Sequence, residues 1–273
     1  MISPMGSGYF SGPKPRLYGH RGAAARAPEN TLESFRRAIE DGAKYLELDV
    51  HATSDGVVVV IHDSTLERTT DGSGEIRKAV FRDLRGIDAG YRFEIDGTYP
   101  FRGRGVRVPS LQELLAELPG VPLNVEIKQA EPPIEAEVKR LLDVHGAGGH
   151  VVLAAELDVV MARIRTAAPE VATSASAGEA REFFERFFGE RLGGYRPEFH
   201  ALQIPTFFGD IELVTPATIA AAHELGLEMH VWTINDPREM ERLLRLGVDG
   251  LMSDDPALLV TVAGRLAGER SRW

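Results

Sequence analysis

The 273-residue sequence contains no cysteine, which excludes disulfide bonds and metal sites built on thiolates. Any metal ion must therefore be held by oxygen or imidazole ligands. Basic residues are also in deficit, with 31 lysines and arginines against 41 acidic residues and a formal net charge of -10. Because we find no local basic patch, that charge disfavours nucleic acid and anionic lipid surfaces as partners. An anionic substrate would need a local positive charge, which a bound metal ion can supply.

A long apolar run and a secretory signal are missing as well. No stretch reaches the roughly 18 to 20 apolar residues that a membrane-spanning helix needs, so we expect no stable membrane insertion. Residues 1–15, MISPMGSGYFSGPKP, lack the charged and apolar regions of a signal peptide. We expect these residues to form a flexible tail, and a cytoplasmic location follows by default.

From Arg16 onward, short apolar runs alternate with segments of helical period, which is typical of βα units around a parallel sheet. The segments TPATIAAAHELG and DPREMERLLRLG each begin with a capping residue and proline and end in glycine, as helices do. The expected strands are 16–19, 44–50, 122–127, 150–154, 171–175, 200–204, 227–232 and 249–253. Eight strands with their helices, at this chain length, predict an α/β fold: a (β/α)8 TIM barrel forming one domain over residues 16–273.

One segment interrupts the alternation. The stretch ATSDGVVVVIHD, residues 52–63, follows the second strand directly and leaves no room for a crossover helix, so we expect a hairpin with an Asp-Gly turn. A turn at Ser54 and Asp55 would place His62 opposite Glu47. Residues 64–109, rich in Gly, Arg and Asp, are longer than a plain loop and are expected to form a small inserted lid.

Acidic residues occupy strand positions where a buried strand would normally carry Val or Ile. Glu47 and Asp49 share one face of the second strand near its carboxyl end, and Glu126 repeats the pattern in the next barrel strand, PLNVEIK. Three such carboxylates would repel one another or take up protons unless a positive charge compensates them. A divalent cation, Mg²⁺ or Ca²⁺, does so. The alternative is a set of structural ion pairs with buried arginines.

Basic and imidazole side chains are predicted at the same end of the barrel. His20 and Arg21 lie between glycines in GHRG, His62 ends the hairpin, and Lys128 shares a face with Glu126. Two imidazoles beside an acidic metal site fit phosphodiester hydrolysis, in which protons move and phosphate oxygens need positive charge. Arg21 and Lys128 are the candidate phosphate contacts. A structural role is the alternative for any single histidine, and it is expected for the other six.

Three more residues have expected roles, and for Glu29 and Trp232 there is an alternative. Glu29 is expected either to orient His20 or add to the outer shell of the metal, or to be a plain loop acid. Asn30, with Thr31, is expected to cap the following helix. Trp232, at the end of the seventh strand, is either an aromatic wall for the substrate or a core residue.

The sequence resembles the glycerophosphodiester phosphodiesterases, which are PLC-like phosphodiesterase TIM barrels, through HRGAAARAPENTLESFRRAIEDGAKYLELDVHATSDGVVVVIHDSTLERTTDGSG. The resemblance continues through PLNVEIK, VWTIN and GVDGLMSDDP and covers nearly the whole chain after residue 15. It implies a TIM barrel with an insertion after the HD motif, and metal-dependent hydrolysis of glycerophosphodiesters to glycerol 3-phosphate and an alcohol. The implied roles are metal ligands for Glu47, Asp49 and Glu126, an acid–base pair for His20 and His62, phosphate contacts for Arg21 and Lys128, and a site role for Glu29 in PEN.

Other functions stay open at this point. A phospholipase D-like hydrolase of lysophospholipids or sphingolipids would need an apolar surface around the mouth, and residues 64–109 are more polar than that. A non-catalytic barrel that binds a phosphorylated ligand would not need the two histidines. A metal-dependent lyase or isomerase would have less need of Arg21 and Lys128 together. The expected partner is a small phosphodiester, and the oligomeric state is open.

Overall fold

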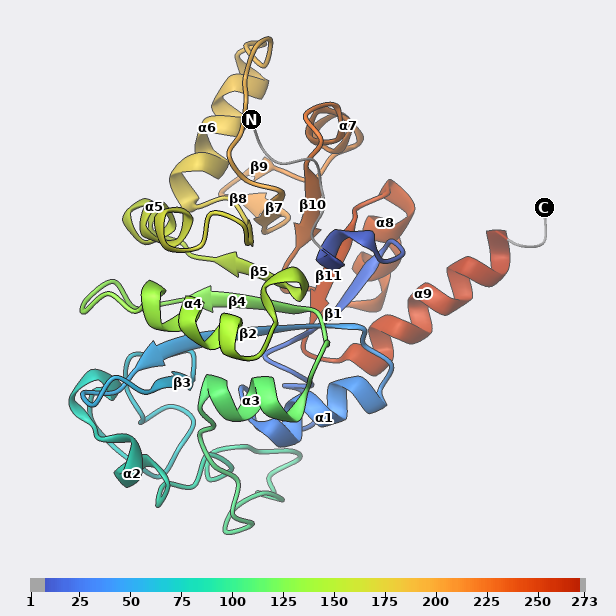
Figure 1. Cartoon of the computed structure of the whole chain (residues 1–273). Coiled ribbons are helices and arrows are strands. Elements are labelled where there is room, and N and C mark those ends of the chain that lie inside the picture. Colours follow the sequence, from blue (N-terminus) through green and yellow to red (C-terminus); the bar gives the residue numbers. More distant parts are fainter. Residues whose placement is uncertain (1–7, 271–273) are drawn as a thin grey trace.

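The computed structural model describes residues 8–270 and has the predicted α/β architecture of a TIM barrel (Figure 1). Eight parallel strands form one sheet in the order β6-β5-β4-β2-β1-β11-β10-β7. They are β1 (Arg16–His20), β2 (Tyr45–Ala52), β4 (Leu123–Ile127), β5 (Val151–Ala154), β6 (Ala172–Thr173), β7 (Ala201–Ile204), β10 (Glu228–Val231) and β11 (Gly250–Ser253). Each lies within two residues of its expected ends.

The barrel closes between β6 and β7. A parallel bridge joins Ser174 to Ala201, and the His200 backbone N–H donates to the Thr173 carbonyl at 2.9 Å. Because every barrel strand runs the same way, the loops that follow the strands share one mouth, where TIM-barrel active sites are built.

Helices surround the sheet, as the helical periods predict (Figure 1). They are α1 (Leu32–Glu40), α3 (Leu111–Glu117), α4 (Glu135–Val144), α5 (Asp158–Ala167), α6 (Ala177–Phe188), α7 (Pro216–Glu224), α8 (Pro237–Leu246) and α9 (Pro256–Arg270). The caps follow the sequence signals: the Asp236 side chain accepts from two backbone N–H groups at the start of α8, and Gly247 ends that helix at a φ of 92°. No helix between residues 8 and 270 has both the length and the apolar character to cross a bilayer.

Strand β2 shows how the sequence separates core from site. All eight of its residues are buried. Leu46, Leu48 and Val50 pack outward into the apolar layer beneath the helices. Because side chains alternate across a strand, Glu47 and Asp49 point into the barrel instead.

The predicted hairpin is present, but its register differs from the expected one by one residue. Strand β3 (Val58–Val60) pairs antiparallel with β2, with Val50 opposite Val60 and Ala52 opposite Val58. The turn has three residues instead of two, because Gly56 adopts a left-handed conformation at a φ of 81°. The expected pairing of His62 with Glu47 is therefore wrong, and the regular ladder has ended before His62 is reached.

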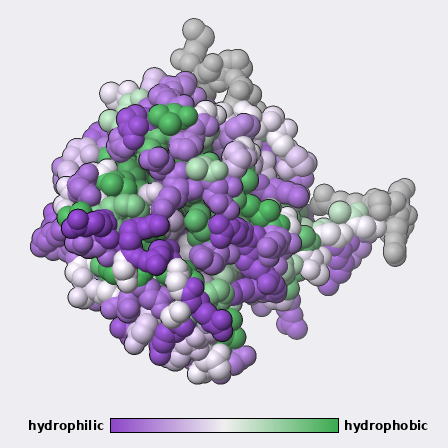
Figure 2. Space-filling view, turned by 60° about the horizontal axis from the view of Figure 1, so that its bottom comes forward, coloured by the Kyte–Doolittle hydropathy of each residue, from purple (hydrophilic) through white to green (hydrophobic). Residues whose placement is uncertain are grey.

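Residues 64–109 pack beside β3 around a small apolar cluster of their own, and contain η2 (Ile76–Lys78) and α2 (Phe81–Leu84). This excursion lies at the bottom of Figure 1, in teal and green. Figure 2 turns that side toward the viewer and shows a mostly hydrophilic face with small hydrophobic groups between.

Gly8–Pro15 do not form the expected flexible tail, whereas residues 1–7 of that tail lie outside the described part of the chain. The segment begins with η1 (Gly8–Ser11), near η3 (Gly148–His150), and Tyr9 is fully buried, with its hydroxyl 2.8 Å from that of Tyr18. The fully buried Arg16 donates to both Glu228 carboxylate oxygens, at 2.7 and 2.8 Å, and to the Phe10 carbonyl at 2.8 Å. This network anchors the segment at the end of the barrel opposite the mouth.

Candidate active site

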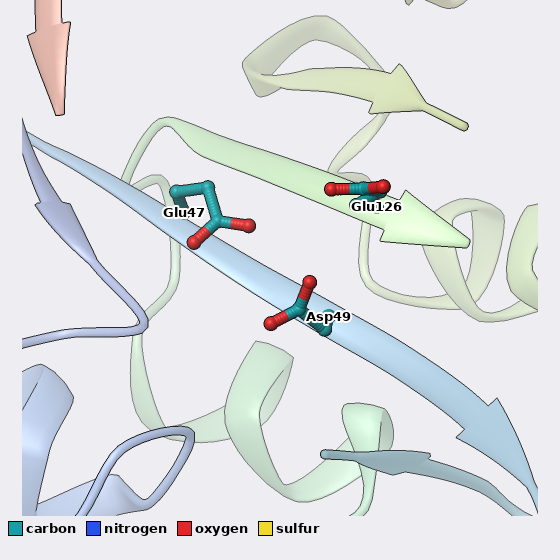
Figure 3. Close-up of side chains that lie close together, drawn as sticks. All are labelled: Glu47, Asp49 and Glu126. Carbon is teal, nitrogen blue, oxygen red and sulfur yellow. The ribbon is translucent and has the colours of Figure 1, made fainter. Parts of the chain in front are cut away.

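Three carboxylates from the neighbouring strands β2 and β4 lie close together (Figure 3). Asp49 is in register with Glu126 on the neighbouring strand, and Glu47 lies two residues earlier on the same face of β2. One oxygen from each of the three lies within 4.8 Å of the others. Glu47 and Asp49 are 3% and 1% exposed, so water screens this concentration of negative charge only weakly.

The electrostatics of this acid cluster are unbalanced. Burial, followed by the charge of Asp49, raises the pKa of Glu47 to about 8. Burial also raises the pKa of Glu126, although Lys128 opposes it. Asp49 differs: Lys128 and Arg21 outweigh the effect of its burial and lower its pKa. Two of the three acids thus ionise less readily than a free carboxyl group, and another positive charge would favour their ionised form.

Basic groups occupy part of the space between the acids. The Lys128 ammonium lies 2.7 Å from Glu126 Oε1 and 3.4 Å from Asp49 Oδ1, and Arg21 Nε lies 3.2 Å from Asp49 Oδ2. Arg21 has a φ of 52°, and its backbone N–H donates to Glu47 at 3.0 Å. The sequence predicts that Lys128 and Glu126 share one face, and the ion pair between them is consistent with that prediction.

The donor set suits a hard divalent cation. Only carboxylate oxygens converge here, they are largely buried, and their charge is incompletely compensated, which is the chemistry that Mg²⁺ and Ca²⁺ prefer. Within residues 8–270, this is the one group of three or more metal-ligating side chains with such spacing.

His20 ends β1 beside the acid cluster. Its Nδ1 lies 2.7 Å from Asp254 Oδ1, and because a carboxylate can only accept, Nδ1 carries the proton. Nε2 then carries no proton; it lies 3.5 Å from Thr233 Oγ1 and 3.8 Å from Glu47 Oε2, at the edge of the site where a proton can be transferred. Burial by itself would lower the pKa of His20, but the hydrogen bond to Asp254 and the charge of Glu47 raise it.

His62 is held in the same way. Its Nδ1 lies 2.6 Å from Asp63 Oδ1, and its backbone carbonyl accepts from the His51 ring at 3.0 Å. A positive charge on His62 would lower the pKa of both Asp49 and Glu126, so the ring lies near these two acids. Each histidine therefore has a carboxylate on Nδ1 that leaves Nε2 available.

A groove of about 460 Å³ adjoins this group at the mouth. It is lined by His20, Arg21, Ala24, Ala25, Glu29, Asn235, Asp254, Asp255 and Leu258. Since His20 and Arg21 form part of its wall, a phosphodiester bound in the groove would meet both.

Comparison with known proteins decides the family. A model described as the Glycerophosphoryl diester phosphodiesterase family matches residues 20–258. The chain belongs to this family. A glycerophosphodiester phosphodiesterase of Caldanaerobacter subterraneus subsp. tengcongensis is 29% identical over 257 residues, which cover 91% of this chain and 98% of that protein. A probable glycerophosphodiester phosphodiesterase 2 of Mycobacterium tuberculosis is 31% identical over 245 residues, covering 88% of this chain and 87% of its own length.

Solved structures give the same fold. A glycerophosphodiester phosphodiesterase from Agrobacterium tumefaciens aligns with a TM-score of 0.74 at 27% identity, covering 89% of this chain and 98% of its own. An Oleispira antarctica phosphodiesterase in complex with the product sn-glycerol-3-phosphate aligns with a TM-score of 0.72 at 27% identity, covering 92% and 97%. The region matched by the glycerophosphoryl diester phosphodiesterase family begins at His20 and includes every residue of the acid cluster.

Of the alternatives considered for Glu29, direct orientation of His20 is wrong. The Glu29 carboxylate accepts from Arg21 Nη1 at 3.0 Å and from Arg68 at 2.7 and 2.8 Å, whereas His20 is oriented by Asp254. Burial would raise the pKa of Glu29, but the hydrogen bonds from Arg68 and the charge of Arg21 lower it. Glu29 is therefore ionised and bound to two arginines.

The expected capping role of Asn30 is wrong. Thr31 is the cap of α1, and its side chain accepts from the Ser34 backbone. Asn30 instead has a φ of 57°; its side-chain NH₂ donates to Asp49 Oδ2 at 2.9 Å, and its Oδ1 accepts from the Asp49 backbone at 3.3 Å. It fixes one member of the acid cluster, and the sequence signal for this is its place directly after Glu29 in PEN.

Trp232 and His230 lie only two positions apart, but their surroundings differ. Trp232 is 43% exposed at the end of β10, which fits a wall of the mouth better than the core. His230 is fully buried and bonds to Glu228 at 2.9 Å, as a structural histidine. The sequence analysis did not identify Asp254 and Asp63, although each lies within a motif that it quoted, SDDP and HD.

Proposed function

We propose that this chain hydrolyses glycerophosphodiesters to glycerol 3-phosphate and an alcohol. The observation that carries the proposal is the pair of histidines, each held at Nδ1 by a carboxylate, on a cluster of three converging acids. Family membership and the Oleispira antarctica phosphodiesterase in complex with sn-glycerol-3-phosphate support it.

Glu47, Asp49 and Glu126 would hold one divalent cation, Mg²⁺ or Ca²⁺. Such an ion supplies positive charge to the non-bridging phosphate oxygens. The raised pKa of Glu47 supports this role, because a buried acid next to other acids binds a metal ion in exchange for its proton.

The remaining residues bind the phosphate and move protons. Arg21 and Lys128 place fixed positive charges beside the acid cluster and would bind the phosphate oxygens. One of His20 and His62 accepts the proton of the attacking oxygen at Nε2, and the other, protonated, donates its proton to the leaving alkoxide. The proton count balances over the reaction: one histidine gains what the other loses.

The outer residues of the site complete the proposal. Glu29 would act on the substrate through Arg21, and Trp232 would form a wall of the mouth. We assign one catalytic domain to residues 16–273, with residues 64–109 as its insertion, and a small phosphodiester as its ligand. The cytoplasmic location stays a prediction, which cell fractionation would test.

The decisive assay measures released glycerol 3-phosphate from a panel of glycerophosphodiesters, with EDTA and then with Mg²⁺ or Ca²⁺ added back. His20→Ala and His62→Ala should each lower kcat by on the order of 10² to 10⁴ without unfolding the barrel. His150→Ala, at an exposed histidine outside the site, is the control. Full activity in both site variants, or indifference to chelator, would refute the assignment.

One observation favours a second candidate, a phospholipase D-like activity on lysophospholipids. The loop after β7 carries a hairpin of β8 (Phe207–Phe208) and β9 (Ile211–Glu212), whose Phe207, Phe208 and Ile211 are exposed. It begins three residues after Ile204, whose carbonyl accepts from the backbone N–H of Trp232 at the end of β10. Faster turnover of lysophosphatidylcholine than of glycerophosphocholine, lost in Phe208→Ser, would select this activity.

A further inference from the structure

Arg68 lies in the first turn of the excursion after the HD motif and joins two carboxylates. Its Nε donates to Asp63 Oδ2 at 2.5 Å and its Nη2 to Asp63 Oδ1 at 3.1 Å. Its Nη1 and Nη2 donate to the two oxygens of Glu29 at 2.8 and 2.7 Å. One planar guanidinium thus forms a two-pronged contact with each of two acids, which a lysine cannot reproduce.

Each of these acids has a second partner inside the candidate site. Asp63 Oδ1 accepts from His62 Nδ1 at 2.6 Å, and Glu29 Oε1 accepts from Arg21 Nη1 at 3.0 Å. A continuous chain of hydrogen bonds therefore runs from His62 through Asp63, Arg68 and Glu29 to Arg21.

This chain connects two loops that the barrel strands leave separate. Arg21 and Glu29 belong to the loop between β1 and α1, whereas His62 and Asp63 follow β3. The strands set the backbone of each loop, but the distance between the His62 ring and the Arg21 guanidinium depends on what joins the loops.

An exposed ion pair usually contributes little, and Arg68 is 45% exposed. Its partners are more enclosed, at 21% for Glu29 and 28% for Asp63, and all four contacts share one rigid plane. The arrangement thus sets geometry more than it adds stability. Without Arg68, each carboxylate would keep only its site partner and would be free to swing with it.

We propose that Arg68 is a positioning residue, through which the excursion holds the His62 ring and the Arg21 guanidinium in one relative geometry. The inference rests on the proposed function for its consequence in catalysis. The polar excursion then contributes directly to the site, although Arg68 itself touches no member of the acid cluster in the described contacts.

The test compares Arg68→Gln and Arg68→Lys with Arg85→Gln, a matched control whose arginine is 46% exposed and pairs with Glu113 of α3. Arg68→Gln should lower kcat and raise KM, with a loss in kcat/KM of about 10- to 100-fold, as for other residues that orient a site from outside it. Arg68→Lys should lie between Arg68→Gln and the wild type. Arg85→Gln should match the wild type, and all melting temperatures should agree closely.

A second readout does not depend on turnover. Nitrogen NMR of the metal-free protein should show the His62 proton fixed on Nδ1 and a slowly exchanging Arg21 guanidinium, and both signatures should be lost in Arg68→Gln but kept in Arg85→Gln. If the wild type hydrolyses no glycerophosphodiester, the proposed function fails while this measurement still decides the role of Arg68. Unchanged His62 and Arg21 signals in Arg68→Gln, or a kcat/KM within twofold of the wild type, would overturn the inference.

Discussion

Metal binding to the acid cluster should release a proton, and the number released should depend on pH. With the pKa of Glu47 at about 8 in the metal-free protein, about nine-tenths of its carboxyls are protonated at about pH 7 and about one-tenth at about pH 9. A metal ion needs the ionised form. Binding near pH 7 should therefore release about 0.9 proton and be about tenfold weaker than at high pH, a difference of about 1.4 kcal/mol.

Stability should follow the same linkage. The pKa of Glu47 in the folded protein lies above its unfolded value of about 4.3. The contribution of Glu47 to the free energy of unfolding is therefore fully present below about pH 4.3 and is lost as the pH rises through about 8. The metal-free protein should lose stability over this range, and the rise in Tm on adding Mg²⁺ or Ca²⁺ should grow with pH.

Isothermal titration in two buffers with different enthalpies of ionisation measures the proton count directly. Glu47→Gln should remove the pH-dependent part and weaken binding, whereas Glu135→Gln, at a buried glutamate of α4, should change neither. The reasoning would be refuted if metal binding released no proton near pH 7, or the same number at about pH 7 and about pH 9. Lys128 and Arg21 would then already neutralise the acid cluster.

Three further predictions concern residues around the site and the core. Asn30→Gly keeps the left-handed backbone but removes the amide that binds Asp49, so metal affinity should fall about 10- to 100-fold in titration calorimetry, with little change in Tm. Asp254→Asn keeps an acceptor oxygen but removes the negative charge at His20 Nδ1, so kcat should fall about 10- to 100-fold and the pH–rate profile should shift to lower pH; an unchanged profile would contradict the assigned role. Arg16→Leu leaves Glu228 buried without its main partner and should cost about 3 to 5 kcal/mol in urea unfolding, while activity per folded molecule stays unchanged because the pair lies opposite the mouth.

The regular part of the molecule could be predicted because each strand and helix carries a local pattern. Apolar runs identified the eight barrel strands, and capping residues identified the helices between them. Acidic residues at positions where an apolar strand normally carries Val or Ile drew attention to Glu47, Asp49 and Glu126. The register of the β2–β3 hairpin could not be fixed in the same way. It depends on whether Gly56 joins the turn, and the Asp-Gly pair is compatible with two- and three-residue turns alike.

The partners of the site residues depend on contacts that no local pattern encodes. Asp254 reaches His20 only because the parallel pairing of β11 with β1 brings their ends together, although 234 positions separate the two residues in the chain. Arg68 reaches Glu29 only because the excursion folds back over the loop after β1. The barrel thus supplies the chemical groups from its strand ends, while long-range contacts between loops supply their orientation. Substitutions at Asp254, Asn30 and Arg68 should accordingly alter rate or affinity far more than stability, whereas Arg16 should show the reverse.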